Sequence, residues 1–286
     1  MSKSQPVKLA VVRTERLTPR MQRVVFGGEG FATFLSRRNA LAPLAGGTAT
    51  DCYVKLVFLD PDTVYPEPLD LDEVRDVVPR DAWPVLRTYT VRWIDQQAEE
   101  LAIDFVVHGP DSVRADSAGG QGYAGPWAMR AKAGEVMHLR GPSGAYAPDP
   151  AADWHLFVGD EAAIPAIGAA LERLDSGATA VAFIEIADET EQQSFATTAD
   201  LDLNWLHRGD AEPGSTELLD EAVRAFDWLP GRVHVFLHGE SSLLKSVRPY
   251  VLNERGVPRA DVSVSGYWRR GNSEESFRVW KSQQSD

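Results

Sequence analysis

The sequence has very little cysteine and no long apolar run. Its single cysteine, Cys52, cannot form a disulfide within the chain, and no set of Cys and His residues has zinc or iron–sulfur spacing. We therefore expect no metal held by the protein itself. The N-terminal residues lack the apolar core of a signal peptide, and no apolar run approaches the ~18 residues of a membrane span. The sequence thus predicts a soluble cytoplasmic protein with no membrane partner.

Basic residues are scarce relative to acidic ones. Twenty-nine Lys and Arg against 42 Asp and Glu give a formal net charge of −13. This charge disfavours a broad phosphate-binding surface, so we expect no nucleic-acid partner. The chain has 286 residues, of which 43% are hydrophobic and 25% charged. That length and composition are typical of a globular protein with one or two domains, each burying its own core.

The first half of the chain contains short runs rich in β-branched and aromatic residues, with no long helical pattern between them. These runs cover residues 7–12, 21–26, 53–58, 87–93 and 101–107. Repeated strands of this kind predict a small β-barrel. Residues 60–84 contain five prolines among many acids, so we expect an exposed loop inserted between two barrel strands.

After a segment rich in Pro, Ala and Asp near residues 146–153, apolar strands alternate with helices. We expect strands at 154–159, 180–186, 232–237 and 262–265, and helices at 162–174, 216–226 and 242–255. Such alternation predicts a parallel sheet with right-handed crossovers, which is typical of nucleotide-binding domains. The predicted domains are residues 5–148 and residues 152–286.

The first segment that could carry chemistry is Arg87-Thr88-Tyr89-Thr90. Alternation along a strand places Arg87 and Tyr89 on one face. A guanidinium that binds phosphate and a ring that stacks on an isoalloxazine would suit a flavin dinucleotide. An ordinary barrel strand with a surface arginine explains this short motif equally well.

The second segment runs from Asp104 to Gly109 and includes His108. A lone histidine is more often a structural hydrogen-bonding group than an acid–base catalyst. The loop that follows is rich in glycine, with Gly119, Gly120 and Gly122, and could bring backbone amides close to a pyrophosphate. A flexible surface loop is the alternative.

The third segment, residues 159–167, turns from strand to helix where a dinucleotide fold places its phosphate loop. It lacks the G-x-G-x-x-G pattern, and Asp160 and Glu161 there would repel a pyrophosphate. Acids in this position suit ribose or adenine contacts, or they cap the following helix.

The fourth segment lies near the C-terminus, where Tyr267-Trp268-Arg269-Arg270 precedes a predicted helix capped by Ser273. Phe277 and Trp280 are three residues apart and share one face of that helix. For these two aromatic residues, packing on the core is the preferred interpretation.

Together and in this order, the segments resemble the siderophore-interacting protein family. Its members are flavin-dependent ferric-siderophore reductases related to the ferredoxin reductase superfamily. The resemblance lies in the combination and covers most of the chain. It includes residues 51–56, 87–90, 104–109, 124–128, 159–167 and 266–271, of which the last two segments are the most specific.

The resemblance implies an N-terminal six-stranded antiparallel β-barrel that binds FAD, followed by a C-terminal α/β parallel-sheet domain that receives NADPH or NADH. The flavin would carry the chemistry, so no side chain is implied as a catalyst. Arg87 would bind the pyrophosphate, Tyr89 would stack on the isoalloxazine, and Ala162 stands where family members often have Thr. The full set of implied cofactor-binding residues is Arg87, Thr88, Tyr89, Thr90, Asp104, Phe105, Val107, His108, Gly125, Trp127, Ala128, Asp160, Glu161 and Ala162.

The implied substrate is a ferric siderophore, whose iron needs no ligand from the protein. Because the chelate is anionic and the protein is net acidic, basic residues are required beside the flavin. The candidates are Lys55, Arg130 and Arg269, with Lys245, Arg248 and Arg270 in reserve. Each of them could instead be a solvated surface charge.

Two other functions remain open on the sequence. One is a general flavin or electron-transfer reductase of the same superfamily, and the other is a protein that binds a ferric siderophore without turnover. The electron donor is also open and includes ferredoxin. Glu185 at a strand end could favour NADH by repelling a 2′-phosphate, whereas Arg208 or Arg232 could bind that phosphate.

Overall fold

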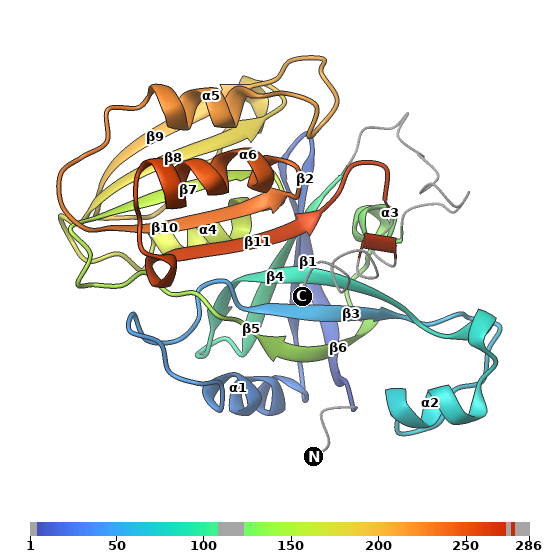
Figure 1. The fold of residues 1–286 in the computed structure, drawn as a ribbon. Helices are drawn as coiled ribbons and strands as arrows, with labels where there is room; N and C mark the ends of the chain where they lie inside the picture. The colour runs from blue at the N-terminus through green and yellow to red at the C-terminus, as the bar shows by residue number, and fades with distance from the viewer. Residues whose placement is uncertain (1–4, 108–122, 273–275, 278–286) are drawn as a thin grey trace.

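The structure, a computed structural model, describes residues 5–107, 123–272 and 276–277 (Figure 1). A closed six-stranded barrel is followed by a five-stranded parallel sheet with helices on both faces. The predicted fold class is therefore confirmed. The predicted division between residues 148 and 152 falls in the segment between the last barrel strand and the first sheet strand. We retain that division as a proposal for the domain boundary.

The barrel is antiparallel, with the strand order β1-β2-β5-β4-β3-β6. Apolar side chains fill its interior, including Leu101, Ile103 and Phe105 from alternate positions of β5. The sixth strand, which had no separate sequence prediction, pairs with both β1 and β3 and closes the barrel. The strands are β1 (Val7–Thr18), β2 (Met21–Gly27), β3 (Tyr53–Phe58), β4 (Val85–Asp95), β5 (Glu100–Val106) and β6 (Val136–Ser143).

Short helices are inserted between the barrel strands, and one of them corrects a prediction. Residues 60–84 are not simply a loop, because they contain a helix at 71–77. Asp70 caps this helix by accepting hydrogen bonds from two backbone N–H groups, and Leu71 and Val74 pack against Val57. A good cap and two buried apolar residues thus outweigh the flanking prolines. The inserted elements are α1 (Phe31–Asn39), α2 (Leu71–Val77), η1 (Arg80–Ala82) and α3 (Ala124–Arg130).

The second half forms a parallel sheet in the order β11-β10-β7-β8-β9. Its three central strands are buried on both faces, so that Phe157 packs beneath α4 while Leu156 and Val158 pack beneath α5 and α6. Figure 1 shows α5 and α6 on the face away from the barrel. The elements are β7 (Trp154–Asp160), α4 (Ile164–Leu171), β8 (Thr179–Ile186), η2 (Glu189–Glu191), β9 (Asp200–His207), α5 (Leu218–Ala225), β10 (Val233–Glu240), α6 (Leu243–Pro249), η3 (Tyr250–Glu254), η4 (Arg259–Asp261) and β11 (Val262–Trp268).

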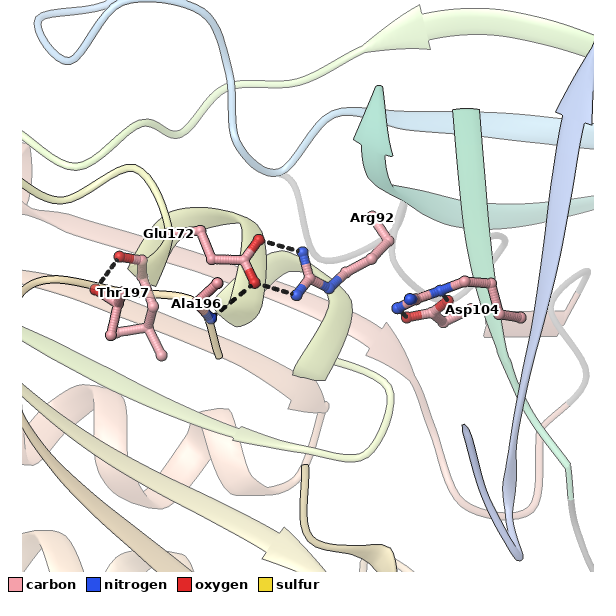
Figure 2. A network of polar contacts seen from close by, with 7 residues as sticks. Arg92, Asp104, Glu172, Ala196 and Thr197 are labelled. Carbon is pink, nitrogen blue, oxygen red and sulfur yellow. Dashed lines mark hydrogen bonds and ion pairs between the residues drawn. The ribbon is translucent and has the colours of Figure 1, made fainter. Parts of the chain in front are cut away.

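An ion pair ties the barrel to the sheet domain. Both terminal nitrogens of Arg92 on β4 donate to the Glu172 carboxylate at the end of α4, at 2.7 and 2.6 Å (Figure 2). Gly168 leaves room for this contact, because a Cβ there would lie 3.0 Å from the Arg92 guanidinium. Thr18 adds a second link by donating to Glu191 at 2.5 Å. These contacts join β4 to the end of α4 and β1 to η2.

Buried histidines in the sheet should make the protein less stable in mild acid. Burial, reinforced by the neighbouring His234, lowers the pKa of His155 to about 4. The unfolded chain binds a proton at this residue below about pH 6.5 whereas the native state does not, so stability rises with pH in this range. Between pH 7 and pH 5 the His155 contribution should cost about 2 kcal/mol.

The substitution His155→Leu should therefore flatten the pH dependence of the free energy of unfolding. Urea unfolding of the wild type and the variant at several values between pH 7.5 and pH 5 measures it. Only the slopes are compared, because the substitution also changes packing. Parallel curves for the two proteins would contradict the argument.

Candidate functional site

The Arg87-Thr88-Tyr89-Thr90 segment lies on β4, beside β3 and α3. The Arg87 guanidinium lies over the Tyr123 ring, 5.3 Å from its centroid, and donates to the Leu86 carbonyl oxygen at 2.9 Å. The Tyr89 ring packs on Phe105, with 4.5 Å between centroids. Arg87 and Tyr89 are both half-buried. The structure therefore places a guanidinium and a phenol ring along one stretch of strand.

Helix α3 covers the barrel core next to these two residues. Trp127 packs against Phe26, Phe58 and Phe105, with ring centroids between 5.7 and 6.1 Å apart. A Cβ at Gly125 would lie 3.4 Å from the Val106 carbonyl oxygen, so the helix begins in close contact with β5. The predicted residues Gly125, Trp127 and Ala128 thus lie on an element that adjoins Arg87 through Tyr123.

Strand β11 places the C-terminal segment, residues 267–270, next to the segment of β4 at residues 87–90. Tyr267 and Thr90 are joined by a side-chain hydrogen bond, and burial holds the pKa of the Tyr267 phenol above its usual value. Beneath Tyr267 lies His238, in an edge-to-face contact with 5.2 Å between ring centroids. The end of the parallel sheet therefore meets the β4 motif of the barrel.

The second predicted segment is only partly within the described residues. Asp104 is buried and accepts two hydrogen bonds from Arg23, at 2.6 and 2.8 Å (Figure 2). Phe105 is fully buried inside the barrel, and Val107 is buried at the end of β5. His108 and the glycines at 119, 120 and 122 lie outside the described residues.

Asp160 does not cap α4, which corrects that part of the prediction. It is the last residue of β7 and accepts hydrogen bonds from the Ala162 and Glu240 backbone N–H groups and from Trp268 Nε1, at 2.7 to 2.9 Å. The helix starts four residues later without a side-chain cap. Burial, reinforced by the Glu161 charge, raises the pKa of Asp160 to about 7, although these donors act in the opposite direction. Asp160 instead joins the ends of three strands.

The neighbouring acids at this sheet edge have partners of their own. Glu161 pairs with Arg208 at 2.5 Å, and the two side chains are 8% and 1% exposed. Glu185, near the end of β8, accepts a hydrogen bond from the Thr216 hydroxyl, and burial raises the pKa of its carboxyl group. The Glu161–Arg208 pair and Glu185 thus lie at the carboxyl ends of the strands.

Arg232 does not belong to this edge. It precedes β10 and pairs with Asp149 and Asp261, at 2.7 and 2.6 Å. A residue just before a parallel strand lies at the amino ends of the sheet, opposite the crevice in which nucleotides bind. The alternative that Arg232 binds a 2′-phosphate is therefore wrong.

The candidate substrate residues come from three elements that adjoin the β4 motif. Lys55 of β3 is opposite Thr88 in the strand register. Arg130 ends α3 and is exposed, and Arg269 follows the last residue of β11. Sequence reasoning missed Tyr123, whose ring lies under Arg87. The one feature of the sequence that indicated Tyr123 is its position as an aromatic residue directly after the glycine-rich segment.

The described part of the chain contains neither a candidate metal site nor a membrane-spanning helix. Within residues 5–107, 123–272 and 276–277, no three His, Cys, Asp or Glu side chains gather where they could hold a metal ion. The same part of the chain contains no helix that is both long and apolar enough to cross a membrane.

An antiparallel six-stranded barrel followed by this parallel sheet is the ferredoxin reductase-like fold. Within that class, the chain belongs to the siderophore-interacting protein family, as the sequence predicted. The family model described as a siderophore-interacting FAD-binding domain matches residues 10–146. The model described as siderophore-interacting protein matches residues 152–271.

Similar proteins match over nearly the whole chain. An uncharacterized protein of Mycobacterium tuberculosis H37Rv is 47% identical, over 95% of this chain and 93% of the relative. The ferric vibriobactin reductase of Vibrio cholerae is 30% identical, over 95% of this chain and 92% of that relative. The crystal structure of a siderophore utilization protein from T. fusca superposes with a TM-score of 0.72 at 36% identity, covering 93% of both chains.

Proposed function

We propose that this protein reduces ferric siderophores through bound FAD, with electrons from NADPH or NADH, and releases Fe(II). The observation that carries the proposal is the hydrogen bond between Tyr267 of the parallel sheet and Thr90, which lies on the same stretch of β4 as Arg87 and Tyr89. The proposed flavin-binding segment would thus lie where the two halves of the fold join. Membership of the family and the similarity to a ferric vibriobactin reductase support the choice of substrate.

The donor set at this corner fits FAD. Arg87 offers a planar guanidinium for a pyrophosphate, and Tyr89 offers a ring that Phe105 supports from the barrel interior. Gly125 presents no side chain where α3 begins. A bound flavin would accept two electrons as hydride and release them singly, which matches a nicotinamide donor to Fe(III).

The protein's own residues would bind and orient the reactants. Arg87 would hold the phosphates, and Thr90 would be held in place by its hydrogen bond to Tyr267. The remaining proposed cofactor contacts are Thr88, Val107, His108, Trp127 and Ala128, with Asp160, Glu161 and Ala162 toward the adenosine end. Asp104 and Phe105 have buried side chains and would act from behind the site, Asp104 by pairing with Arg23 and Phe105 by packing on Tyr89. Lys55, Arg130 and Arg269 would attract the anionic chelate, which the net charge of −13 would otherwise repel.

The test is an anaerobic turnover assay of the FAD-loaded protein. We expect oxidation of NADH or NADPH that depends on a ferric siderophore, with Fe(II) trapped by a colorimetric chelator. Protein with stoichiometric FAD that turns over with neither nicotinamide nor reduced ferredoxin would refute the proposal. Faster reduction of quinones than of ferric chelates would indicate a general reductase, and siderophore binding without turnover would indicate a carrier. The cytoplasmic location stays a prediction from the sequence.

A further inference from the structure

The topology of the sheet defines where a nicotinamide dinucleotide would bind. The chain runs outward from β7 through β8 to β9 and then returns to the other side of β7 as β10 and β11. In open parallel sheets, nucleotides bind at the carboxyl ends of the strands where the order reverses, which here is between β7 and β10. In the dinucleotide-binding form of this sheet, an acid about 20 residues beyond the first turn from strand to helix hydrogen-bonds the ribose 2′-hydroxyl of NAD, and the end of the second strand is the corresponding place here.

Glu185 occupies that position in this chain. It is the penultimate residue of β8, and its register partner on β7 is Asp160. The side chain is buried, and the Thr216 hydroxyl donates a hydrogen bond to one of its carboxylate oxygens. The second carboxylate oxygen of Glu185 has acceptor capacity for a ribose hydroxyl. Thr216 thus acts as a positioning residue for this carboxylate.

The charges around Glu185 oppose a 2′-phosphate. The chain has no Lys or Arg between Arg173 and Arg208, and three acids, Asp188, Glu189 and Glu191, follow directly after β8. Arg208 lies at this edge, where Glu161 already pairs with it in a buried contact. A phosphate monoester carries about −1.5 to −2 charges at pH 7, so binding it beside Glu185 would bring like charges together.

Arg208 is buried within its ion pair. The residue is 7% exposed, and its guanidinium already pairs with the Glu161 carboxylate. Recruiting Arg208 to a 2′-phosphate would require breaking this buried contact, which would leave the Glu161 charge unpaired.

We propose that Glu185, positioned by Thr216 beside the Glu161–Arg208 pair, makes this protein select NADH over NADPH. The inference rests on the proposed function and adds the identity of the electron donor. The physical cause is repulsion of the 2′-phosphate, together with a hydrogen bond from the ribose 2′-hydroxyl to Glu185. NADH carries a free 2′-hydroxyl and no 2′-phosphate, so it avoids the repulsion and can donate the hydrogen bond to Glu185.

The test is calorimetric binding of NAD⁺ and of NADP⁺ to the oxidised, FAD-loaded protein, followed by anaerobic flavin reduction with NADH and with NADPH. We expect NAD⁺ to bind at least ~10-fold more tightly than NADP⁺. The variant Glu185→Gln should lower the ratio of the NADP⁺ dissociation constant to the NAD⁺ dissociation constant at least ~5-fold, mainly by strengthening NADP⁺ binding. The double variant Glu185→Gln with Glu189→Arg should lower this ratio further, because it adds a positive charge at an exposed residue of η2, which follows β8.

Asp175→Asn is the matched control. Asp175 is exposed and precedes β8, so this variant removes one negative charge at the opposite end of the same strand. The Asp175→Asn variant should leave the ratio of the NADP⁺ and NAD⁺ dissociation constants unchanged. Equal narrowing by Asp175→Asn and Glu185→Gln would show a general charge effect and overturn the assignment of Glu185.

Other outcomes separate this inference from the proposed function. Equal or tighter binding of NADP⁺ by the wild type would overturn the inference and leave the proposed function intact. If neither nucleotide binds while reduced ferredoxin drives ferric-siderophore turnover, the selection of NADH is overturned and reduction of ferric siderophores still stands. If the protein does not bind FAD at all, the proposed function itself fails.

Discussion

Replacing Arg87 and Tyr89 together by alanine is expected to abolish FAD retention, with at least ~100-fold weaker binding. The change removes the guanidinium proposed for the pyrophosphate and the ring proposed for the isoalloxazine. Charge-assisted hydrogen bonds of this kind contribute about 1.5–3 kcal/mol each, and loss of the ring contact adds to this. The measurement is FAD content after desalting, with the affinity obtained from titration of the apoprotein.

Two further variants make this result specific. Arg75→Ala removes an exposed arginine of α2 and should leave FAD content unchanged. Arg87→Lys keeps the charge but loses the planar fork, so FAD binding should weaken without loss of fold. Full FAD retention by a folded Arg87→Ala/Tyr89→Ala protein would contradict the placement of the flavin at this corner.

Most of the architecture could be predicted because its elements carry strong local signals. Runs such as residues 53–58 are apolar and β-branched, and they became β3 with unchanged bounds. Strand β9 was missed although Leu201 and Leu203 alternate with Asp200 and Asp202, the pattern of an edge strand with one buried face. Strand β9 has no continuous apolar run, and such runs were the main signal for the other strands of the sheet.

The candidate site was harder to predict, because its contacts join residues far apart in the chain. Alternation predicted that Arg87 and Tyr89 share a face, since that is a local property of a strand. Nothing local indicated that Arg23 would occupy the Asp104 carboxylate, since β2 and β5 become neighbours only in the closed barrel. The alternative that Asp160 caps α4 was wrong for the same reason, because its partners Glu240 and Trp268 come from two other strands.

The substitution Asp160→Ala should cause the largest loss of stability among single changes at the strand ends. It would leave the Ala162 and Glu240 backbone N–H groups and Trp268 Nε1 without their acceptor in a buried position. An unsatisfied buried donor costs about 1–3 kcal/mol, so for the three donors we expect a total of about 3–9 kcal/mol and a melting temperature lower by roughly 10 °C or more. Thermal and urea unfolding measure both quantities.

The loss at Asp160 should also reach the flavin corner. Trp268 is next to Tyr267, whose hydrogen bond to Thr90 joins β11 to β4. Release of the indole therefore loosens the contact between the sheet and the barrel, so the folded variant should show altered flavin fluorescence as well as lower stability. Asp202→Ala, an exposed position on β9, is the control and should change the free energy of unfolding by less than about 0.5 kcal/mol. If Asp160→Ala cost no more than this control, the carboxylate would not be what holds the three strand ends together.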